Sequence, residues 1–429
     1  MMRLLKTSGL SGVATLLKIL TSLLSLKIVS IYTGPEGVAI LGQFMALVNI
    51  FAVIAGGGIS LGVIKYVAEY RLSSSRLISF LGNASAYTLF FSTITLLLGL
   101  MFSRYLSHLI LGAAEYDYLI RWLAIVQLFV AINTLFCSVI NGFEQIKRLV
   151  IVNISSSVIS MVLVSIMSVY FQLKGTLLAF ILSQGLAAFI TLLVIVRQDW
   201  FPHLLAFRFK TTYWLDLSRY SLMNIISALT VPVAQIIVRN DLNHQFGWEF
   251  VGYWQAVLRV SDAYLLFVTT ALTAYYLPRL SQLKTNQALK AEMWQSYKIL
   301  MPIIAVTLFS IQAGRDLIIR ILYTEGFEAA SDLFLWQLVG DFFRIAGWLL
   351  TYLLLAKSWT KMYIATEITL SILFVIISHV LSRGYGLIGA SYAFALTYFI
   401  YWLIMLGVSL IYFRKNREII PDLGHSYSV

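Results

Sequence analysis

The chain has one cysteine, few charged residues and none of the common catalytic sequence motifs. Only 12% of its 429 residues are charged, about half the share of a soluble domain, so the composition is that of a membrane protein. Cys137 alone permits neither an intrachain disulfide nor a thiolate metal cage, and its apolar surroundings predict a packing role. Phosphate-binding loops, HExxH, GxSxG and His/Cys clusters are lacking, so we expect no catalytic residues, no metal, no cofactor and no ATP hydrolysis, and an enzyme is disfavoured.

Long hydrophobic runs are abundant instead. A membrane-spanning helix needs roughly 20 mostly apolar residues. We therefore predict an all-α, polytopic membrane protein with about twelve transmembrane helices, at residues 8–32, 40–66, 79–102, 118–140, 147–171, 175–196, 218–238, 250–277, 294–312, 329–356, 361–382 and 387–413. The glycines of "AGGGISLG" (55–62) predict a bend or close helix contact in the second segment.

The positive charge of the chain follows membrane topology. A net charge of +12 could indicate nucleic acid, but the basic residues gather at the ends of hydrophobic segments and not on one polar face. In the predicted topology most of them lie on the same side of the membrane as the N-terminus, and Lys and Arg are enriched in cytoplasmic loops. We therefore expect both termini in the cytoplasm and no nucleic-acid partner.

The chain is predicted to consist of two halves. Its longest connection is basic and aromatic, which suits a membrane interface on the cytoplasmic side. The predicted order is an N-terminal six-helix bundle, an interfacial linker, a C-terminal six-helix bundle and a cytoplasmic tail, at residues 1–200, 201–217, 218–414 and 415–429.

An internal repeat supports this division. "SRYLSHLILGAAEYDYL" (103–119) aligns without gaps on "GRDLIIRILYTEGFEAA" (314–330), and Tyr116 matches Phe327. Each copy is predicted at an outer connection between the third and fourth helices of its half. Parallel repeats of this kind occur in secondary transporters.

Four charged residues form two matching pairs inside predicted spans. In "LRVSDAY", Arg259 stands three residues before Asp262. In "GDFFR", Asp341 stands three residues before Arg344. Residues at i and i+3 share a helix face, and a charge at mid-bilayer costs about 2.5–3.5 kcal/mol. Each pair either neutralises itself within one helix or faces a central cavity, where the cations would bind an anionic ligand and the carboxylates would take up protons or cations.

Other charges within the spans are single. Lys18 and Lys27 are about half a turn out of phase on one helix, so both face one cavity only if that helix bends. Lys27 is near the outer end and can extend its ammonium to the interface, which makes Lys18 the better cavity candidate. Arg239, at the outer end of its span, is a borderline candidate. Glu367 has either a bundle-facing or a coupling role.

Several long stretches carry a family resemblance. They are "YTGPEGVAILGQF" (32–44), "GGGISLGVIKYVAEY" (56–70), "VGYWQAVLRVSDAYLLFVTTALTAYYLPRLS" (251–281) and "FLWQLVGDFFRIAGWLLTYLLLAK" (334–357). With these stretches in this order, the chain resembles the Wzx-type flippases of the polysaccharide branch of the MOP superfamily, which also includes MATE exporters and the lipid II flippase.

The resemblance implies a MOP/MATE-like fold in the bacterial inner membrane. It implies that the protein moves undecaprenyl-pyrophosphate-linked O-antigen or enterobacterial common antigen units to the outer leaflet. It further implies alternating access coupled to an ion gradient. Other polysaccharide assembly proteins (polymerase, chain-length regulator) are further candidate partners. A pyrophosphate needs cations in a low-dielectric site. The candidate substrate contacts are Lys18, Lys27, Arg259, Arg344 and Arg239, and the candidate coupling carboxylates or counter-ions are Asp262, Asp341 and Glu367. The alternatives are a MATE-like exporter of cationic drugs, whose site should be net acidic, and a membrane glycan polymerase or ligase.

Overall fold

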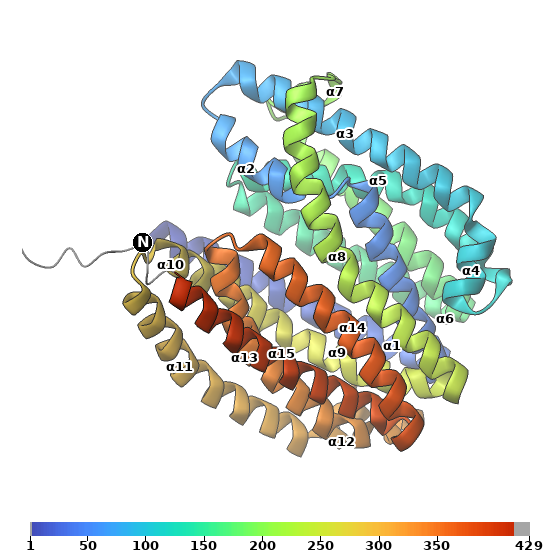
Figure 1. The fold of residues 1–429 in the computed structure, drawn as a ribbon. Coiled ribbons are helices and arrows are strands. Elements are labelled where there is room, and N and C mark those ends of the chain that lie inside the picture. Colours follow the sequence, from blue (N-terminus) through green and yellow to red (C-terminus); the bar gives the residue numbers. More distant parts are fainter. Residues whose placement is uncertain (1, 416–429) are drawn as a thin grey trace, which may run out of the picture. The chain divides into compact units, whose positions relative to one another are not determined.

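The computed structural model describes residues 2–415, except for the side chains of residues 2–11, 219, 220, 223 and 274. Regular structure in this part is entirely helical, which confirms the predicted fold class (Figure 1). The elements are α1 (Met2–Ala55), α2 (Ser60–Tyr70), α3 (Ser74–Met101), α4 (Ser103–Leu111), η1 (Ala114–Tyr116), α5 (Asp117–Gly142), α6 (Ile146–Ile195), α7 (Phe201–Leu205), α8 (Thr211–Phe246), α9 (Trp248–Ala271), η2 (Leu272–Tyr276), α10 (Leu277–Gln282), α11 (Asn286–Ala313), α12 (Arg315–Leu322), η3 (Glu325–Leu333), α13 (Phe334–Ala356), α14 (Thr360–Tyr385) and α15 (Ile388–Lys415).

Nine helices of the described residues are long and apolar enough to cross a membrane. Two of them, α1 and α6, are about twice as long as one crossing requires. Each is broken at a single residue with positive φ, at Gly34 (φ 62°) and Gln172 (φ 49°). The 24-residue α9 is not among the nine, and it carries Arg259 and Asp262. The count of about twelve and the cytoplasmic termini stay predictions.

Two glycine-containing sequences interrupt the helices where the chain must turn. Gly34 takes a left-handed conformation, and Pro35 directly after it has the fixed φ that suits the start of a new helix. Gly57 and Gly58 have φ of 65° and 62° and separate α1 from α2. The predicted bend in "AGGGISLG" is therefore confirmed.

One turn of π-helix, η2, joins α9 to α10. Pro278 follows it, and a proline can give no N–H to the helical hydrogen-bond ladder. A π turn contains one residue more than an α-helical turn. Single π turns are frequent at functional sites.

The described residues divide into two compact units. The first runs to Ala256 and also includes Leu317–Ala330; the second comprises Val257–Asp316 and the chain from Ser331 on. Residues 201–217, the predicted linker, lie within the first unit. The partition into two six-helix bundles around that linker stays a prediction.

The linker region packs firmly on the first unit. Trp200 and Leu204 are buried in one hydrophobic core with side chains of α2, α3 and α5. The backbone N–H of Arg208 donates to the Gly82 carbonyl oxygen at 3.2 Å. The N–H of Lys210 donates to the side chain of Asn83 at 2.6 Å. This region is thus an ordered part of the unit and not a free tether.

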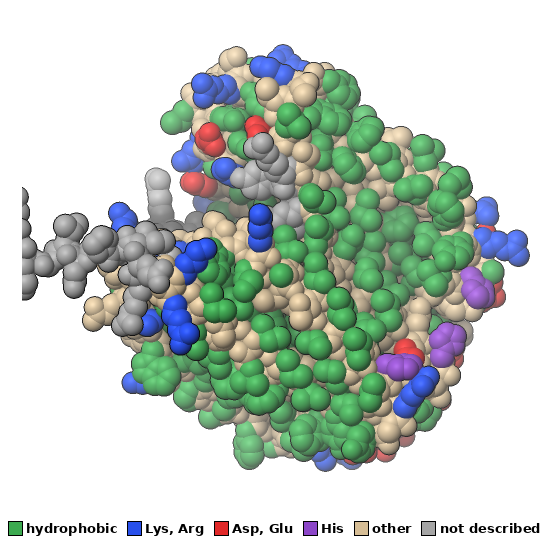
Figure 2. Space-filling model, in the orientation of Figure 1, with side chains coloured by type: hydrophobic (Ala, Val, Ile, Leu, Met, Phe, Trp, Pro, Cys, Tyr) green, Lys and Arg blue, Asp and Glu red, His purple; other side chains and the backbone are tan. Residues whose placement is uncertain are grey.

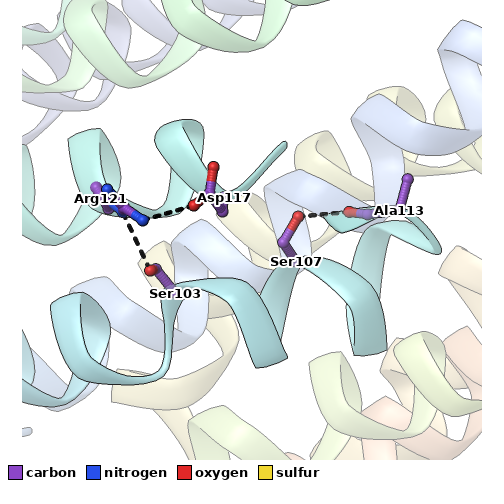
Figure 3. A network of polar contacts seen from close by, with 5 residues as sticks. All are labelled: Ser103, Ser107, Ala113, Asp117 and Arg121. Atoms are coloured by element: carbon purple, nitrogen blue, oxygen red, sulfur yellow. Dashed lines mark hydrogen bonds and ion pairs between the residues drawn. The ribbon is translucent and has the colours of Figure 1, made fainter. Parts of the chain in front are cut away.

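The two predicted repeats have the same order of elements. The first copy forms α4, η1 and the start of α5; the second forms α12 and most of η3, and α13 follows from Phe334. The matched residues Tyr116 and Phe327 are both buried. Two residues after the first copy, Arg121 forms an ion pair with Asp117 on the same helix (2.6 Å) and donates a hydrogen bond to Ser103 of α4 (3.3 Å), which joins α5 to α4 (Figure 3).

Hydrophobic side chains cover most of the face drawn in Figure 2, with Lys and Arg mainly at its margins. Large apolar residues on the helices are widely exposed, among them Leu97 (60%) and Phe309 (75%). Lipid hydrocarbon solvates such an apolar surface at no cost in free energy, and the backbone N–H and C=O groups are hydrogen-bonded within the helices. The chain is therefore a multi-pass membrane protein.

Candidate functional site

The α13 face that carries Asp341 and Arg344 is packed inside the second unit. Asp341 is fully buried, and its Oδ1 lies 3.8 Å from Arg344 Nη1. This is an ion-pair distance that is too long for a hydrogen bond. Arg344 keeps 16% of its side-chain surface exposed. The i,i+3 pair expected from the sequence therefore forms, and Arg344 is its accessible member.

Three aromatic rings surround the Arg344 guanidinium. Its Cζ lies 4.8 Å from the ring centre of Trp348 on the same helix, and 5.2 and 5.9 Å from the ring centres of Tyr398 and Phe394 on α15. A cation at these distances is attracted by ring faces. The rings therefore hold the guanidinium in a fixed orientation.

Close packing of α13 against α15 places those rings. An added Cβ at Gly347 would lie 2.7 Å from the Tyr401 ring, and one at Gly340 would collide with the ring of Phe394. In both pairs, the α15 residue lies 54 positions after its α13 partner. The two helices therefore run parallel in a constant register, and glycine is required where their backbones approach.

The α9 helix holds Asp341 from another direction. The Tyr264 hydroxyl donates to Asp341 Oδ2 at 2.5 Å. On the same helix, Arg259 Nη1 and Asp262 Oδ2 form the second predicted pair at 3.6 Å. Asp262 is 54% exposed and also interacts electrostatically with Arg344. The two predicted pairs thus belong to one cluster.

Glu367 on α14 joins the same cluster loosely. Its Oε1 accepts from the Tyr401 hydroxyl at 3.4 Å, whereas that hydroxyl lies only 2.6 Å from Thr351 Oγ1. Glu367 also interacts electrostatically with Arg344.

The charge balance of this cluster is acidic. Three carboxylates, of Asp262, Asp341 and Glu367, accompany two guanidiniums, of Arg259 and Arg344. Over all the predicted spans, by contrast, the five candidate cations outnumber the three candidate carboxylates. Within the second unit, the carboxylates are therefore suited to binding a proton or cation, and the guanidiniums to binding an anion.

In the first unit, Arg239 is a buried residue of α8. It is 3% exposed, and it donates to Gln255 Oε1 at 2.9 Å and to Gln235 Oε1 at 3.3 Å. Gln255 in turn lies against α1, where an added Cβ at Gly42 would come within 2.5 Å of its side chain. These contacts indicate that Arg239 joins α1, α8 and α9.

The two lysines of α1 differ in their surroundings. Lys27 is partly buried, and its ammonium donates to two backbone carbonyl oxygens at the end of α12, those of Arg320 (3.0 Å) and Tyr323. Lys18 is exposed and makes no side-chain hydrogen bond or ion pair with any residue that the structure describes. Of the two, Lys18 is the cation available to a ligand.

Comparison with known proteins identifies the family. Residues 4–284 match the family described as "Polysaccharide biosynthesis protein". The lipid III flippase of Escherichia coli (strain K12) is 32% identical over 96% of this chain and 100% of that protein. The chain belongs to this family. A putative O-antigen transporter of Shigella flexneri is a more distant relative, 24% identical over 85% of this chain and 87% of its own length.

Solved structures agree on the fold of this chain. The inward closed conformation of the lipid II flippase MurJ has a TM-score of 0.75 at 16% identity, covering 98% of this chain and 94% of that one. An inward-facing multidrug resistance MATE family transporter of the MOP superfamily has a TM-score of 0.78, also at 16% identity, covering 94% and 96%. These similarities confirm the predicted MOP/MATE-like fold.

Two of the stretches that carry the family resemblance meet in the first unit. An added Cβ at Gly252, in "VGYW", would collide with the backbone of Pro35, in "TGPEG". The break in α1 is therefore packed directly against α9.

In the described residues, no three His, Cys, Asp or Glu side chains gather in a way that could hold a metal ion.

The charged members of the cluster were identified from the sequence, but their neutral partners were not. Tyr264, Trp348, Tyr398 and Thr351 have no signal of their own in a chain that is 14% aromatic. A helical projection places Trp348 one turn after Arg344 on the same face, so this partner was recoverable. Tyr264 and Tyr398 come from other helices, and Thr351, on the same helix, reaches the cluster only through Tyr401.

Proposed function

We propose that this protein moves undecaprenyl-pyrophosphate-linked oligosaccharide units, of the O-antigen or enterobacterial common antigen type, from the cytoplasmic to the periplasmic leaflet by alternating access coupled to an ion gradient. The observation that carries the proposal is the full-length relationship, at 32% identity, to a lipid III flippase. A polar glycan attached to a lipid carrier crosses a bilayer only if a protein shields its polar groups from the hydrocarbon.

Arg344 and Lys18 are the proposed pyrophosphate contacts. The Arg344 guanidinium is oriented by rings and paired with Asp341, and it keeps an exposed portion. Guanidinium groups bind phosphate oxygens through two parallel hydrogen bonds, so orientation matters for affinity. Lys18 adds an exposed positive charge from the first unit.

Asp262 and Glu367 are the proposed coupling carboxylates. Asp262 is exposed and 3.6 Å from Arg259, and Glu367 accepts a long hydrogen bond, so neither carboxylate is held by a tight contact. Asp341 is held by Tyr264 and is better suited as the counter-ion of Arg344.

The acidic balance of the cluster supports one rival, a MATE-like exporter of cationic compounds. A chromosomal deletion separates the possibilities. For a flippase, surface glycan is lost, including single repeat units, and lipid-linked units accumulate inside. Altered drug susceptibility with normal glycan indicates the exporter, and persistence of unpolymerised single units on the surface indicates a polymerase or ligase.

The site assignment is tested by substitution at native expression level. We expect Arg344→Ala and Lys18→Ala each to reduce glycan display in the complemented deletion strain, with protein amounts matched by quantitative blotting. If both variants display normal glycan, the electrostatic part of the proposal is wrong.

A further inference from the structure

The segment Leu317–Ala330, here called the strap, belongs to a different unit from its neighbours in sequence. It contains most of α12 and the start of η3 and packs as part of the first unit. The residues before it, up to Asp316, and after it, from Ser331, belong to the second unit. Any movement of one unit against the other must therefore bend the chain at the ends of the strap or detach the strap from the first unit.

Buried aromatic residues attach the strap. Tyr323 and Phe327 are 1% and 0% exposed, and their rings pack together at 4.7 Å. The Tyr323 hydroxyl donates to the carbonyl oxygen of Ala256 at 2.9 Å, and the Phe327 ring meets Tyr253 edge-on at 6.3 Å. These contacts fix the position of the strap on α9.

Lys27 supplies the polar part of the attachment. The last carbonyls of a helix have no partner within it, and a lysine nearby both satisfies them and interacts favourably with the helix dipole. The Lys27 ammonium does this for α12 through the carbonyl oxygens of Arg320 and Tyr323. In this way α1, far away in sequence, caps the strap helix.

The first repeat shows that this cap is particular to α12. Its equivalent helix, α4, ends at Gly112, which adopts a left-handed conformation (φ 73°) and donates its N–H to the His108 carbonyl oxygen at 3.2 Å. The residue aligned with Gly112 is Tyr323, whose Cβ disfavours that conformation. The second copy keeps the equivalent bond, from the Tyr323 N–H to the Ile319 carbonyl oxygen at 2.7 Å, but lacks the left-handed glycine, and a side chain from another helix binds the carbonyl oxygens of Arg320 and Tyr323.

We propose that Lys27 is a positioning residue that latches the strap to the first unit and thereby sets how readily the units rearrange during transport. The effect on transport rests on the proposed function, whereas the latch itself does not. Lys27 is then not a contact for the substrate, because its ammonium is occupied by backbone carbonyls.

Hydrogen exchange on the purified full-length protein in nanodiscs tests the latch. Lys27→Met removes the ammonium and keeps most of the chain volume. We expect the amides of the strap to exchange about tenfold faster than in the wild type, while those of α5 are unchanged. Lys18→Met is the matched control, because it removes the same charge from the same helix without touching the strap, and it should leave strap exchange unaltered.

Lys27→Arg retains a cationic donor and should restore most of the protection. Strap exchange within twofold of the wild type in Lys27→Met, or an equal acceleration in Lys18→Met, would overturn the latch. In cells, we expect Lys27→Met to change the rate of glycan display and Lys27→Arg to restore it. Normal glycan in the deletion strain would refute the proposed function, and the exchange result would still decide the latch.

Discussion

Both units bury an arginine in an apolar interior, but they surround it differently. Arg239 of the first unit is 3% exposed and donates to two neutral glutamine side chains, Gln235 on its own helix and Gln255 on α9. Arg344 of the second unit has a carboxylate partner and three aromatic rings, and part of it remains exposed. The full burial of Arg239 favours a structural joint, whereas the oriented and partly exposed guanidinium of Arg344 fits the proposed site for an anion.

The largest effect is expected from Arg344→Gln. It leaves the Asp341 carboxylate buried without its partner, a loss of about 3–5 kcal/mol of folding stability. We expect a lower melting temperature of the purified protein and a loss of glycan display. The double variant Asp341→Asn/Arg344→Gln buries no charge and should recover most of the melting temperature while glycan display stays absent.

That double variant is the test of the comparison. If glycan display returns together with stability, the Arg344 pair is a structural joint like Arg239, and the anion site must be placed elsewhere.

Tyr264→Phe is next in expected size. It removes the hydroxyl that donates to Asp341 Oδ2, and hydrogen bonds to charged groups contribute about 1.5–3 kcal/mol. The matched control is Tyr253→Phe on the same helix, whose hydroxyl donates to the exposed Glu249 at 2.6 Å. Water replaces the lost donor at Glu249 but not at buried Asp341, so thermal unfolding should show the larger drop for Tyr264→Phe; equal drops would contradict the assigned role of Asp341.

Arg239→Leu should destabilise the protein by about 1–3 kcal/mol, because buried Gln255 and half-buried Gln235 lose their charged donor. Transport per folded molecule should stay near the wild-type value, as measured by glycan display normalised to folded protein. A transport defect in excess of the folding defect would place Arg239 among the substrate contacts and remove the distinction between the units.

The smallest stability effect is expected from Glu367→Gln, under about 0.5 kcal/mol, because its one hydrogen bond is long and the amide oxygen can still accept it. The variant cannot take up a proton, so the dependence of transport on the proton gradient should weaken, as measured in inverted vesicles with and without an ionophore. Unchanged dependence would assign the coupling role to Asp262 alone.

The sequence was sufficient for the features that depend on short-range periodicity. Hydrophobic length predicted the helices, the glycines near Gly57 predicted a bend, and i,i+3 spacing predicted that Asp341 and Arg344 form a pair. Features that depend on long-range register could not be predicted. Nothing in the α13 sequence indicates that Arg344 meets Tyr398 on α15, and nothing near Lys27 indicates carbonyl partners in a helix that follows almost three hundred residues later.

The π turn at η2 has a consequence for how this chain is aligned with its relatives. One additional residue rotates everything that follows by about 100° relative to a continuous α-helix. The face that carries Arg259 and Asp262 on α9 therefore does not continue along α10, although the helical run looks uninterrupted in the sequence. A relative that lacks the turn should show a one-residue gap at 272–276, and an ungapped alignment there would assign each side chain of α10 to the wrong side of its helix.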